Sequence, residues 1–226
     1  MLRCGAVRQL TSKSNKTSKT WMKRHVKDSY VRLAQSEGRV SRSYFKLRQL
    51  DRKFHLFNSS NNVVVDLGAA PGGWTSYVAE IYPHASVVVS VDLNPLDDRV
   101  LQATEAFKDF HFLQGDFHEV RSALRPLLPD GVATTVLSDM APSFCGDKRT
   151  DAIRGLDLCE RALAVAIDLL DNGGSFVGKY FSCPEDRELR SWARKAFKQV
   201  QCVKPDASRK ESAERFLVCT GYRNKF

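Results

Sequence analysis

Short apolar runs alternate with amphipathic stretches over most of this chain. The apolar runs are rich in valine and in other β-branched or aromatic residues, which is typical of strands buried on both faces. Segments with helical periodicity separate them. The alternation predicts a mostly parallel sheet covered by helices on both faces, a doubly wound α/β fold. The expected strands are 63–67, 85–93, 110–116, 133–139 and 175–181, and the expected helices include 74–82, 153–170 and 184–197.

The two ends of the pattern differ from this repeat. Between residues 21 and 57 we expect two helices, the second with an apolar stripe of Tyr44, Phe45, Leu47 and Leu50. Near the C-terminus, strands at 200–203 and 214–222 are joined by ten residues, too few for a helical crossover. These last strands should therefore form an antiparallel hairpin at the edge of the sheet.

The positive charge is concentrated at the N-terminal end. The net charge is +9, of which the first 56 residues carry +12 and the remainder −3. A basic region beside a near-neutral domain is typical of a protein that meets phosphates, and a solvated tail is the alternative. Residues 1–20 are basic, with Arg3 and Arg8, and rich in Ser and Thr, which fits either a mitochondrial transit peptide or an RNA-binding arm.

Length and composition limit the remaining possibilities. A chain of 226 residues suffices for one α/β domain, which we place at 21–226 with basic N-terminal helices, after a disordered segment 1–20. No run approaches the roughly 20 apolar residues of a membrane span, so none is expected. Six scattered cysteines, without a C-x-x-C pair or the spacing of a zinc site, predict reduced thiols and no metal.

The stretch VVVDLGAAPGGWTSY, residues 63–77, predicts a ligand site. A loop of small residues, Gly68 to Gly73, follows the first strand, where doubly wound sheets bind ligands. It has neither the Walker pattern nor G-x-G-x-x-G. The acids Asp66, Asp92 and Asp116 end successive strands without a matching cation, which favours a ligand with a ribose, an amine and a positive charge. S-adenosylmethionine has all three, although each acid alone could be a helix cap or turn residue.

A family resemblance covers about residues 40–223. The motifs VVDLGAAPGGW, VDLNP, FLQGDF, LSDMAP, FVGKYF and PDASRKESAERFLVCTGY occur in this order. Together they resemble the FtsJ/RrmJ family of ribosomal RNA 2'-O-ribose methyltransferases. The resemblance implies a Rossmann-like class I methyltransferase fold with seven strands, S-adenosylmethionine as cofactor, ribosomal RNA as partner and a monomer.

The same resemblance implies a catalytic tetrad of Lys46, Asp139, Lys179 and Glu214. In-line methyl transfer to a ribose hydroxyl requires two positioned reactants and removal of a proton. Lys179 is the candidate for the proton, either as a base or as a charged group that stabilises the developing alkoxide. With a reference pKa of ~10.4, a lysine is neutral only about 0.04% of the time at pH 7. Ordinary ion pairing is the alternative interpretation for each of the four residues.

The cofactor-binding residues follow from the same motifs, whereas the RNA-binding residues are cations expected to meet phosphates where RNA crosses the carboxyl edge of the sheet. Tyr44 and Phe45 could stack on a base or pack in the core. The segment 143–154, SFCGDKRTDAIR, is more charged than expected of the family, and the glycine loop continues with Trp-Thr-Ser rather than Trp-Ser-Gln. Cofactor binding is predicted for Asp66, Gly68, Gly73, Trp74, Asp92, Asp116 and Asp139, and RNA binding for Arg39, Arg42, Lys46 and Arg48.

The combined interpretation is an enzyme that methylates a ribose 2'-OH of large-subunit ribosomal RNA and contributes to ribosome assembly. By resemblance, the target is an A-loop uridine and the compartment is the mitochondrion, with the cytoplasm or nucleus as alternatives. Two other functions remain open: a tRNA anticodon-loop ribose methyltransferase, and an RNA-binding assembly factor without catalysis.

Overall fold

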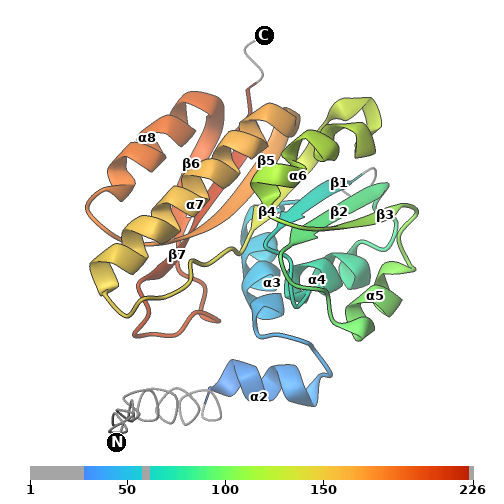
Figure 1. The fold of residues 1–226 in the computed structure, drawn as a ribbon, viewed down its shortest axis with the longest axis horizontal. Helices are drawn as coiled ribbons and strands as arrows, with labels where there is room; N and C mark the ends of the chain where they lie inside the picture. Colours follow the sequence, from blue (N-terminus) through green and yellow to red (C-terminus); the bar gives the residue numbers. More distant parts are fainter. Residues whose placement is uncertain (1–27, 58–61, 224–226) are drawn as a thin grey trace, which may run out of the picture.

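Seven strands form one sheet in the part of the chain that the structure, a computed structural model, describes: residues 28–57 and 62–223 (Figure 1). Their order is β3-β2-β1-β4-β5-β7-β6. Strands β1 to β5 are parallel, whereas β7 is antiparallel to both β5 and β6. The strands are β1 (Val63–Leu67), β2 (Val87–Asp92), β3 (Phe110–Gln114), β4 (Ala133–Ser138), β5 (Leu170–Phe181), β6 (Phe197–Val203) and β7 (Glu214–Tyr222).

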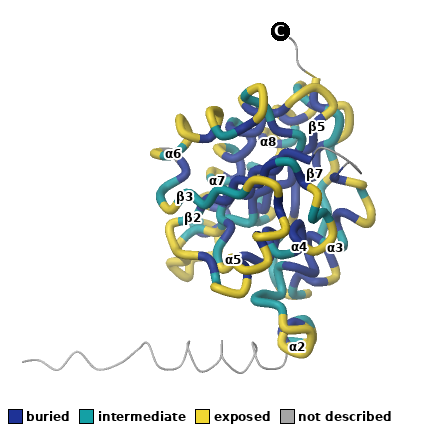
Figure 2. Tube along the Cα trace, turned by 90° about the vertical axis from the view of Figure 1, so that its right-hand side faces the viewer, coloured by how far each residue is buried: buried dark blue, intermediate teal, exposed yellow. Residues whose placement is uncertain are grey.

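Helices cover both faces of this sheet (Figure 1). On one face, α3 and α4 pack on alternate strand residues such as Val64 and Val88; on the other, α6, α7 and α8 pack on Val65 and Val89. The strands lie buried in the middle of the molecule, and the exposed residues gather on the loops and outer helix faces (Figure 2). The helices are α2 (Ser29–Ser36), α3 (Ser43–Phe54), α4 (Gly73–Ile81), α5 (Asp98–Thr104), α6 (Phe117–Leu124), α7 (Lys148–Leu169) and α8 (Asp186–Ala196).

The predicted architecture is confirmed, including the parallel centre and the antiparallel C-terminal hairpin. The helix predicted at 153–170 begins five residues earlier, because the carboxylate of Asp147 caps its first turn by accepting a bond of 2.8 Å from the backbone N–H of Thr150. Strand β5 also begins earlier, at Leu170, so Gly173 and Gly174 lie within it. The predicted helix start near residue 21 and the basic segment 1–20 lie outside the described residues.

A buried carboxylate ties α3 to its neighbours. Asp51 is 5% exposed and accepts hydrogen bonds from the hydroxyls of Tyr77 and Tyr82, each at 2.7 Å, and from the backbone N–H of Leu56 at 2.9 Å. Three donors satisfy a charge that would otherwise be costly to bury. Helix α3 is therefore fixed against α4, which matters because α3 carries one of the predicted catalytic lysines.

Two properties of the described residues complete the picture. No helix among them is both long and apolar enough to cross a membrane. Five of the six cysteines lie within the described ranges and are free thiols, as predicted: Cys145, Cys159, Cys183, Cys202 and Cys219.

Candidate active site

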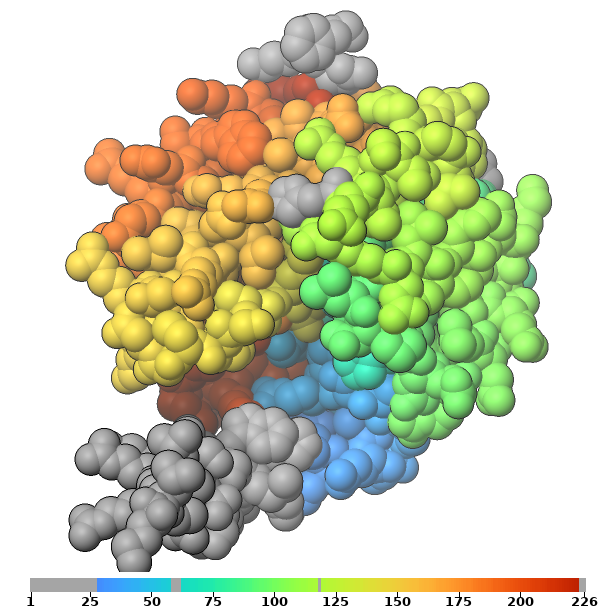
Figure 3. Space-filling model, viewed as in Figure 1, coloured from blue at the N-terminus to red at the C-terminus, as the bar shows by residue number. Residues whose placement is uncertain are grey.

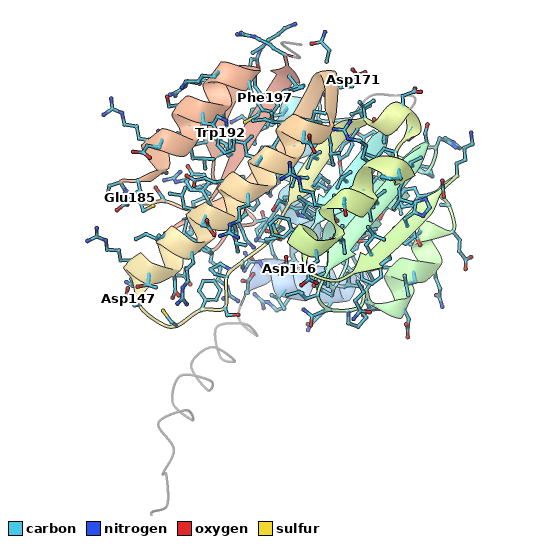
Figure 4. The ribbon with its side chains drawn as sticks, turned by 45° about the horizontal axis from the view of Figure 1, so that its top comes forward. Asp116, Asp147, Asp171, Glu185, Trp192 and Phe197 are labelled. Atoms are coloured by element: carbon cyan, nitrogen blue, oxygen red, sulfur yellow. The ribbon has the colours of Figure 1, made fainter. Side chains whose placement is uncertain are left out.

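The carboxyl ends of the parallel strands form one edge of the sheet, and the predicted tetrad gathers there. Ser138 of β4 pairs with Gly178 of β5, so Asp139 follows beside Lys179. Glu214 begins β7, opposite Phe181 at the end of β5. Asp116 and Asp147 lie at this edge, whereas Asp171, near the start of β5, lies at the opposite one (Figure 4).

The four tetrad side chains form a continuous chain of ion pairs. Lys179 Nζ lies 3.0 Å from Asp139 Oδ1, and it also donates to the backbone carbonyl of Asp139. Lys46 Nζ lies 3.8 Å from the same carboxylate oxygen and 2.8 Å from Glu214 Oε2. Two cations and two anions thus alternate in one cluster, which was predicted only as a set of sequence positions.

This cluster is largely shielded from water. The side chains are between 8% and 15% exposed. Burial alone would raise the pKa of Asp139, but the charges of Lys179 and Lys46 outweigh burial and hold that pKa below its ordinary value. A buried network of this kind is costly unless each charge has a partner, so its presence at a sheet edge indicates a role other than stability.

A residue that sequence reasoning missed orients Glu214. The hydroxyl of Ser208 donates a hydrogen bond of 2.6 Å to Glu214 Oε1, which leaves Oε2 for Lys46. Ser208 lies in the loop between β6 and β7, which α3 anchors because Gln49 Oε1 accepts a bond of 3.0 Å from the backbone N–H of Ala207. The motif PDASRKESAE contains this serine, but nothing in the sequence distinguishes it from the other serines nearby.

The glycine loop between β1 and α4 is shaped by contacts within the chain. Gly68 has φ of +76° and Gly72 has φ of +113°, conformations that favour glycine. A Cβ at Gly68 would overlap Met140, which follows Asp139, and one at Gly73 would overlap Ser43 of α3. The loop therefore packs closely against the β4 loop and α3, and this packing already explains these glycines.

The strand-end acids differ in how their oxygens are used. Asp66 is buried, with Oδ2 accepting 2.8 Å from the Thr75 hydroxyl and Oδ1 without a partner among the described residues. Asp92 accepts from the backbone N–H of Ala70 at 2.9 Å and of Asn94 at 2.8 Å, so it also shapes the loop. Asp116 follows β3 at the same edge (Figure 4).

Burial raises the pKa of Asp66 to about 7, and the charges of Asp139 and Asp92 act in the same direction. The unpartnered oxygen and the surrounding negative charge fit a cationic ligand with hydrogen-bond donors. Asp66, Asp92, Asp116 and Asp139 are thus the residues that could hold S-adenosylmethionine.

Trp74, also predicted to bind the cofactor, is 2% exposed, packs on Phe216 and donates from Nε1 to the carbonyl of Ser43 at 3.0 Å. Packing accounts for its position.

Asp66 gives a prediction about stability. Its pKa is about 7 in the folded state and about 3.9 when unfolded, so between these values the folded state holds a proton that the unfolded state has lost. The free energy of unfolding should therefore fall as pH rises. Relative to the Asp66→Asn variant, the wild type should lose about 2 kcal/mol between pH 5 and pH 7. Urea unfolding of both proteins without cofactor measures this difference; a pH-independent difference would contradict it.

The predicted RNA-binding arginines are mostly paired within the protein. Arg39 forms two bonds to the carboxylate of Glu80, and its guanidinium lies 4.2 Å from the centroid of the Tyr44 ring. Arg42 pairs with Asp28 and donates to the carbonyl of Ala207. Arg48 makes no ion pair with any residue that the structure describes. RNA binding by the first two would require these pairs to open.

The aromatic residues of α3 do not face the site. Tyr44 is 1% and Phe45 2% exposed, and their rings pack edge to face with centroids 5.3 Å apart. The prediction of core packing is therefore confirmed for both residues, and the alternative prediction, that they stack on a base, is wrong. Lys46, which follows Phe45 in sequence, is also buried. Its ammonium group pairs with Glu214 and lies 5.5 Å from the centroid of the Phe216 ring.

The sheet order, the antiparallel β7 and the glycine loop beside strand-end acids define a class I methyltransferase fold. The comparison with known families agrees. The family described as FtsJ-like methyltransferase matches residues 39–222, and the chain belongs to this family.

Curated relatives match over nearly their whole length. "Ribosomal RNA large subunit methyltransferase E" of Acidiphilium cryptum is 41% identical over 224 residues, covering 98% of this chain and 94% of the relative. The protein of that name from Pseudomonas fluorescens is 37% identical over 213 residues, covering 93% and 98%. The corresponding protein of Methanobrevibacter smithii is 36% identical over 207 residues, covering 91% and 95%.

Solved structures share the fold. A putative ribosomal RNA methyltransferase from Plasmodium falciparum superposes with a TM-score of 0.66 at 23% identity, covering 80% of this chain and 97% of that one. Human methyltransferase-like protein 13, solved in complex with SAH, gives a TM-score of 0.55 at 12% identity, covering 79% and 82%.

Proposed function

We propose that this protein transfers a methyl group from S-adenosylmethionine to a ribose 2'-OH of large-subunit ribosomal RNA. The observation that carries this proposal is the buried tetrad, in which Lys179, Asp139, Lys46 and Glu214 form one ion-pair chain beside the glycine loop. The names of relatives that cover more than nine-tenths of this chain support ribosomal RNA as the substrate. The human structural neighbour solved with SAH supports the cofactor.

The tetrad would position and activate the ribose hydroxyl. Bound S-adenosylmethionine supplies an activated methyl group on a sulfonium, for in-line transfer. Lys179 Nζ lies 3.0 Å from the carboxylate oxygen Oδ1 of Asp139 and donates to the backbone carbonyl of the same residue, so an anion and a carbonyl dipole face the lysine. We therefore assign Lys179 the electrostatic role: it donates a hydrogen bond to the 2'-oxygen and stabilises the negative charge that develops as the hydroxyl proton passes to water. Through their ion pairs, Lys46 and Glu214 fix the positions of Asp139 and Lys179.

Methyl transfer to three RNA substrates tests the function. The purified protein is incubated with radiolabelled S-adenosylmethionine and naked large-subunit rRNA, immature large-subunit particles or tRNA. We expect label on rRNA or on the particles, at a single nucleotide located by nuclease mapping. Label only on tRNA would contradict the proposed substrate and indicate an anticodon-loop enzyme. Binding of RNA without label would indicate an assembly factor.

The nucleotide and the compartment are part of the same proposal. An A-loop uridine is the proposed target, and the mitochondrion the proposed compartment, because residues 1–27 contain no acid and several Lys and Arg residues. These residues lie outside the described part of the chain.

Removing residues 1–27 should abolish import into isolated mitochondria and leave methyl transfer by the purified protein within about twofold of the full chain. The described fold begins at Asp28, which caps α2 by accepting from the backbone N–H of Tyr30 at 3.0 Å. Protease protection of the labelled protein measures import. Import of the truncated chain would contradict the transit-peptide assignment, whether or not the protein is a methyltransferase.

A further inference from the structure

The loop after Asp139 carries an exposed aromatic ring. Phe144 is 62% exposed. Its ring meets that of Phe181 edge to face, with centroids 5.6 Å apart and an interplanar angle of 75°. Phe181 in turn packs on Gly155 of α7, where a Cβ would lie 2.6 Å from its ring. The Phe181 ring thus packs against α7, and the Phe144 ring packs on Phe181 with much of its own surface exposed to solvent.

The turn that presents Phe144 is held in place by two carboxylates. Asp151, which is 8% exposed, accepts hydrogen bonds from the backbone N–H groups of Cys145 at 2.8 Å and Gly146 at 3.1 Å. Asp147 caps α7 through Thr150. A ring fixed in this way loses little conformational entropy when a ligand packs on it, which favours binding.

Phe144 and Phe181 border the tetrad. Phe181 lies two residues beyond Lys179 along β5, or ~7 Å at the rise of an extended strand. Phe144 follows Asp139 by five residues. The yellow segment around residue 150, the dark red segment around residue 210 and the blue segment around residue 40 border one hollow of the surface (Figure 3). A group stacked on Phe144 would therefore lie next to a ribose held at Lys179.

Exposed cations accompany this ring. Lys148, Arg149 and Arg154 lie in the first two turns of α7 and are exposed. Arg149 has one long pair, 3.4 Å, to Glu185, and within the described ranges Lys148 and Arg154 form no ion pair. They differ in this respect from Arg39 and Arg42, whose charges are paired. Exposed cations beside an open ring match a nucleic acid, whose phosphates and bases need both.

We infer that Phe144 is a substrate-positioning residue on which an unpaired base of the RNA stacks beside the methylated ribose. The inference rests on the proposed function in taking RNA as the substrate. Aromatic rings bind unpaired bases through their π faces and tolerate different sequences, so Phe144 contributes affinity and register. Phe181 supports the ring from behind, and the cations of α7 contact the flanking phosphates.

Kinetics of Phe144→Ala test this assignment. Stacking holds the base in the ground state and the transition state alike, so we expect KM for the methylated RNA to rise about tenfold with kcat within about twofold. The Phe144→Trp variant should restore KM, whereas Phe144→Leu should not. Trp192→Ala, at an exposed aromatic residue of α8 far from the site, is the matched control and should behave as wild type (Figure 4).

Binding separates this inference from the proposed function. The affinity of each variant for a short, uridine-rich single-stranded RNA is measured by fluorescence anisotropy, which requires no methyl transfer. We expect Phe144→Ala to weaken RNA binding about tenfold. The control Ile153→Ala, at an exposed apolar residue of α7, should leave RNA binding unchanged. Equal binding by wild type and Phe144→Ala would overturn the inference even if methylation occurs. Equal losses from both variants would show that general apolar surface, and not stacking on the Phe144 ring, contributes to RNA binding, and would also overturn it.

Discussion

Replacing Lys179 with alanine should reduce methyl transfer by about 100- to 1,000-fold, the loss typical when a preorganised donor is removed from a developing oxyanion. The Lys179 side chain is 8% exposed, and its ammonium lies 3.0 Å from Asp139 Oδ1, so alanine would remove a buried charge that solvent does not replace. The loss should appear in kcat, because the charge acts on the transition state. Single-turnover transfer of labelled methyl to the RNA measures it.

Two further variants sharpen this experiment. Lys179→Arg keeps a permanent charge but cannot serve as a base, so an electrostatic role predicts activity well above that of Lys179→Ala. Lys195→Ala, at an exposed lysine of α8, should be fully active and controls for loss of positive charge. Activity of Lys179→Ala within about tenfold of wild type would contradict the catalytic assignment. Equal inactivity of the arginine variant would favour the base.

Asp139→Asn should both destabilise the protein and inactivate it. This carboxylate is the counter-charge of Lys179, which has no other ion-pair partner in the described ranges, and it also lies 3.8 Å from Lys46. Removing one partner of a buried pair typically costs about 3 kcal/mol of unfolding free energy, because the remaining charge stays buried. Urea unfolding at neutral pH measures the loss. Methyl transfer by the variant that remains folded should fall at least about 100-fold.

A matched variant tests whether burial is the cause. Asp157 of α7 pairs with Arg161 at 2.8 Å, but both side chains are about half exposed. Asp157→Asn should therefore change the unfolding free energy by less than about 0.5 kcal/mol. A similar loss in both variants would contradict the distinction between the buried tetrad and a surface pair.

The sequence predicts the sheet well because each strand is a short apolar run bounded by turn residues. VVVDL became β1 and the ten residues before Glu214 formed the hairpin connection, as their lengths require. The start of α7 was misplaced because apolar periodicity begins only near Ala152, whereas the first turn is held by the Asp147 cap. Apolar periodicity identifies the buried face of a helix, so it does not detect a first turn that consists of polar residues.

The site was predictable in its residues but not in its environment. Family motifs gave the four tetrad positions, but only the fold shows that Lys46 is buried against Glu214 and Phe216. Contacts between residues far apart in sequence were not visible: Ser208 to Glu214 depends on a loop conformation, and Arg42 to Asp28 on the placement of α2. The exposed ring of Phe144 was equally hidden, since the chain shows an aromatic residue there but not its exposure.

The most direct test of the central claim is the chemical position of the transferred methyl group. Methylation of a 2'-oxygen removes the hydroxyl that attacks the neighbouring phosphate in alkali, so the adjoining phosphodiester resists hydrolysis. After transfer of labelled methyl to large-subunit rRNA, we predict that wild-type protein yields label in one alkali-resistant dinucleotide and that Lys179→Ala yields none. Label recovered in a methylated base of an alkali-released mononucleotide would contradict ribose methylation by this tetrad.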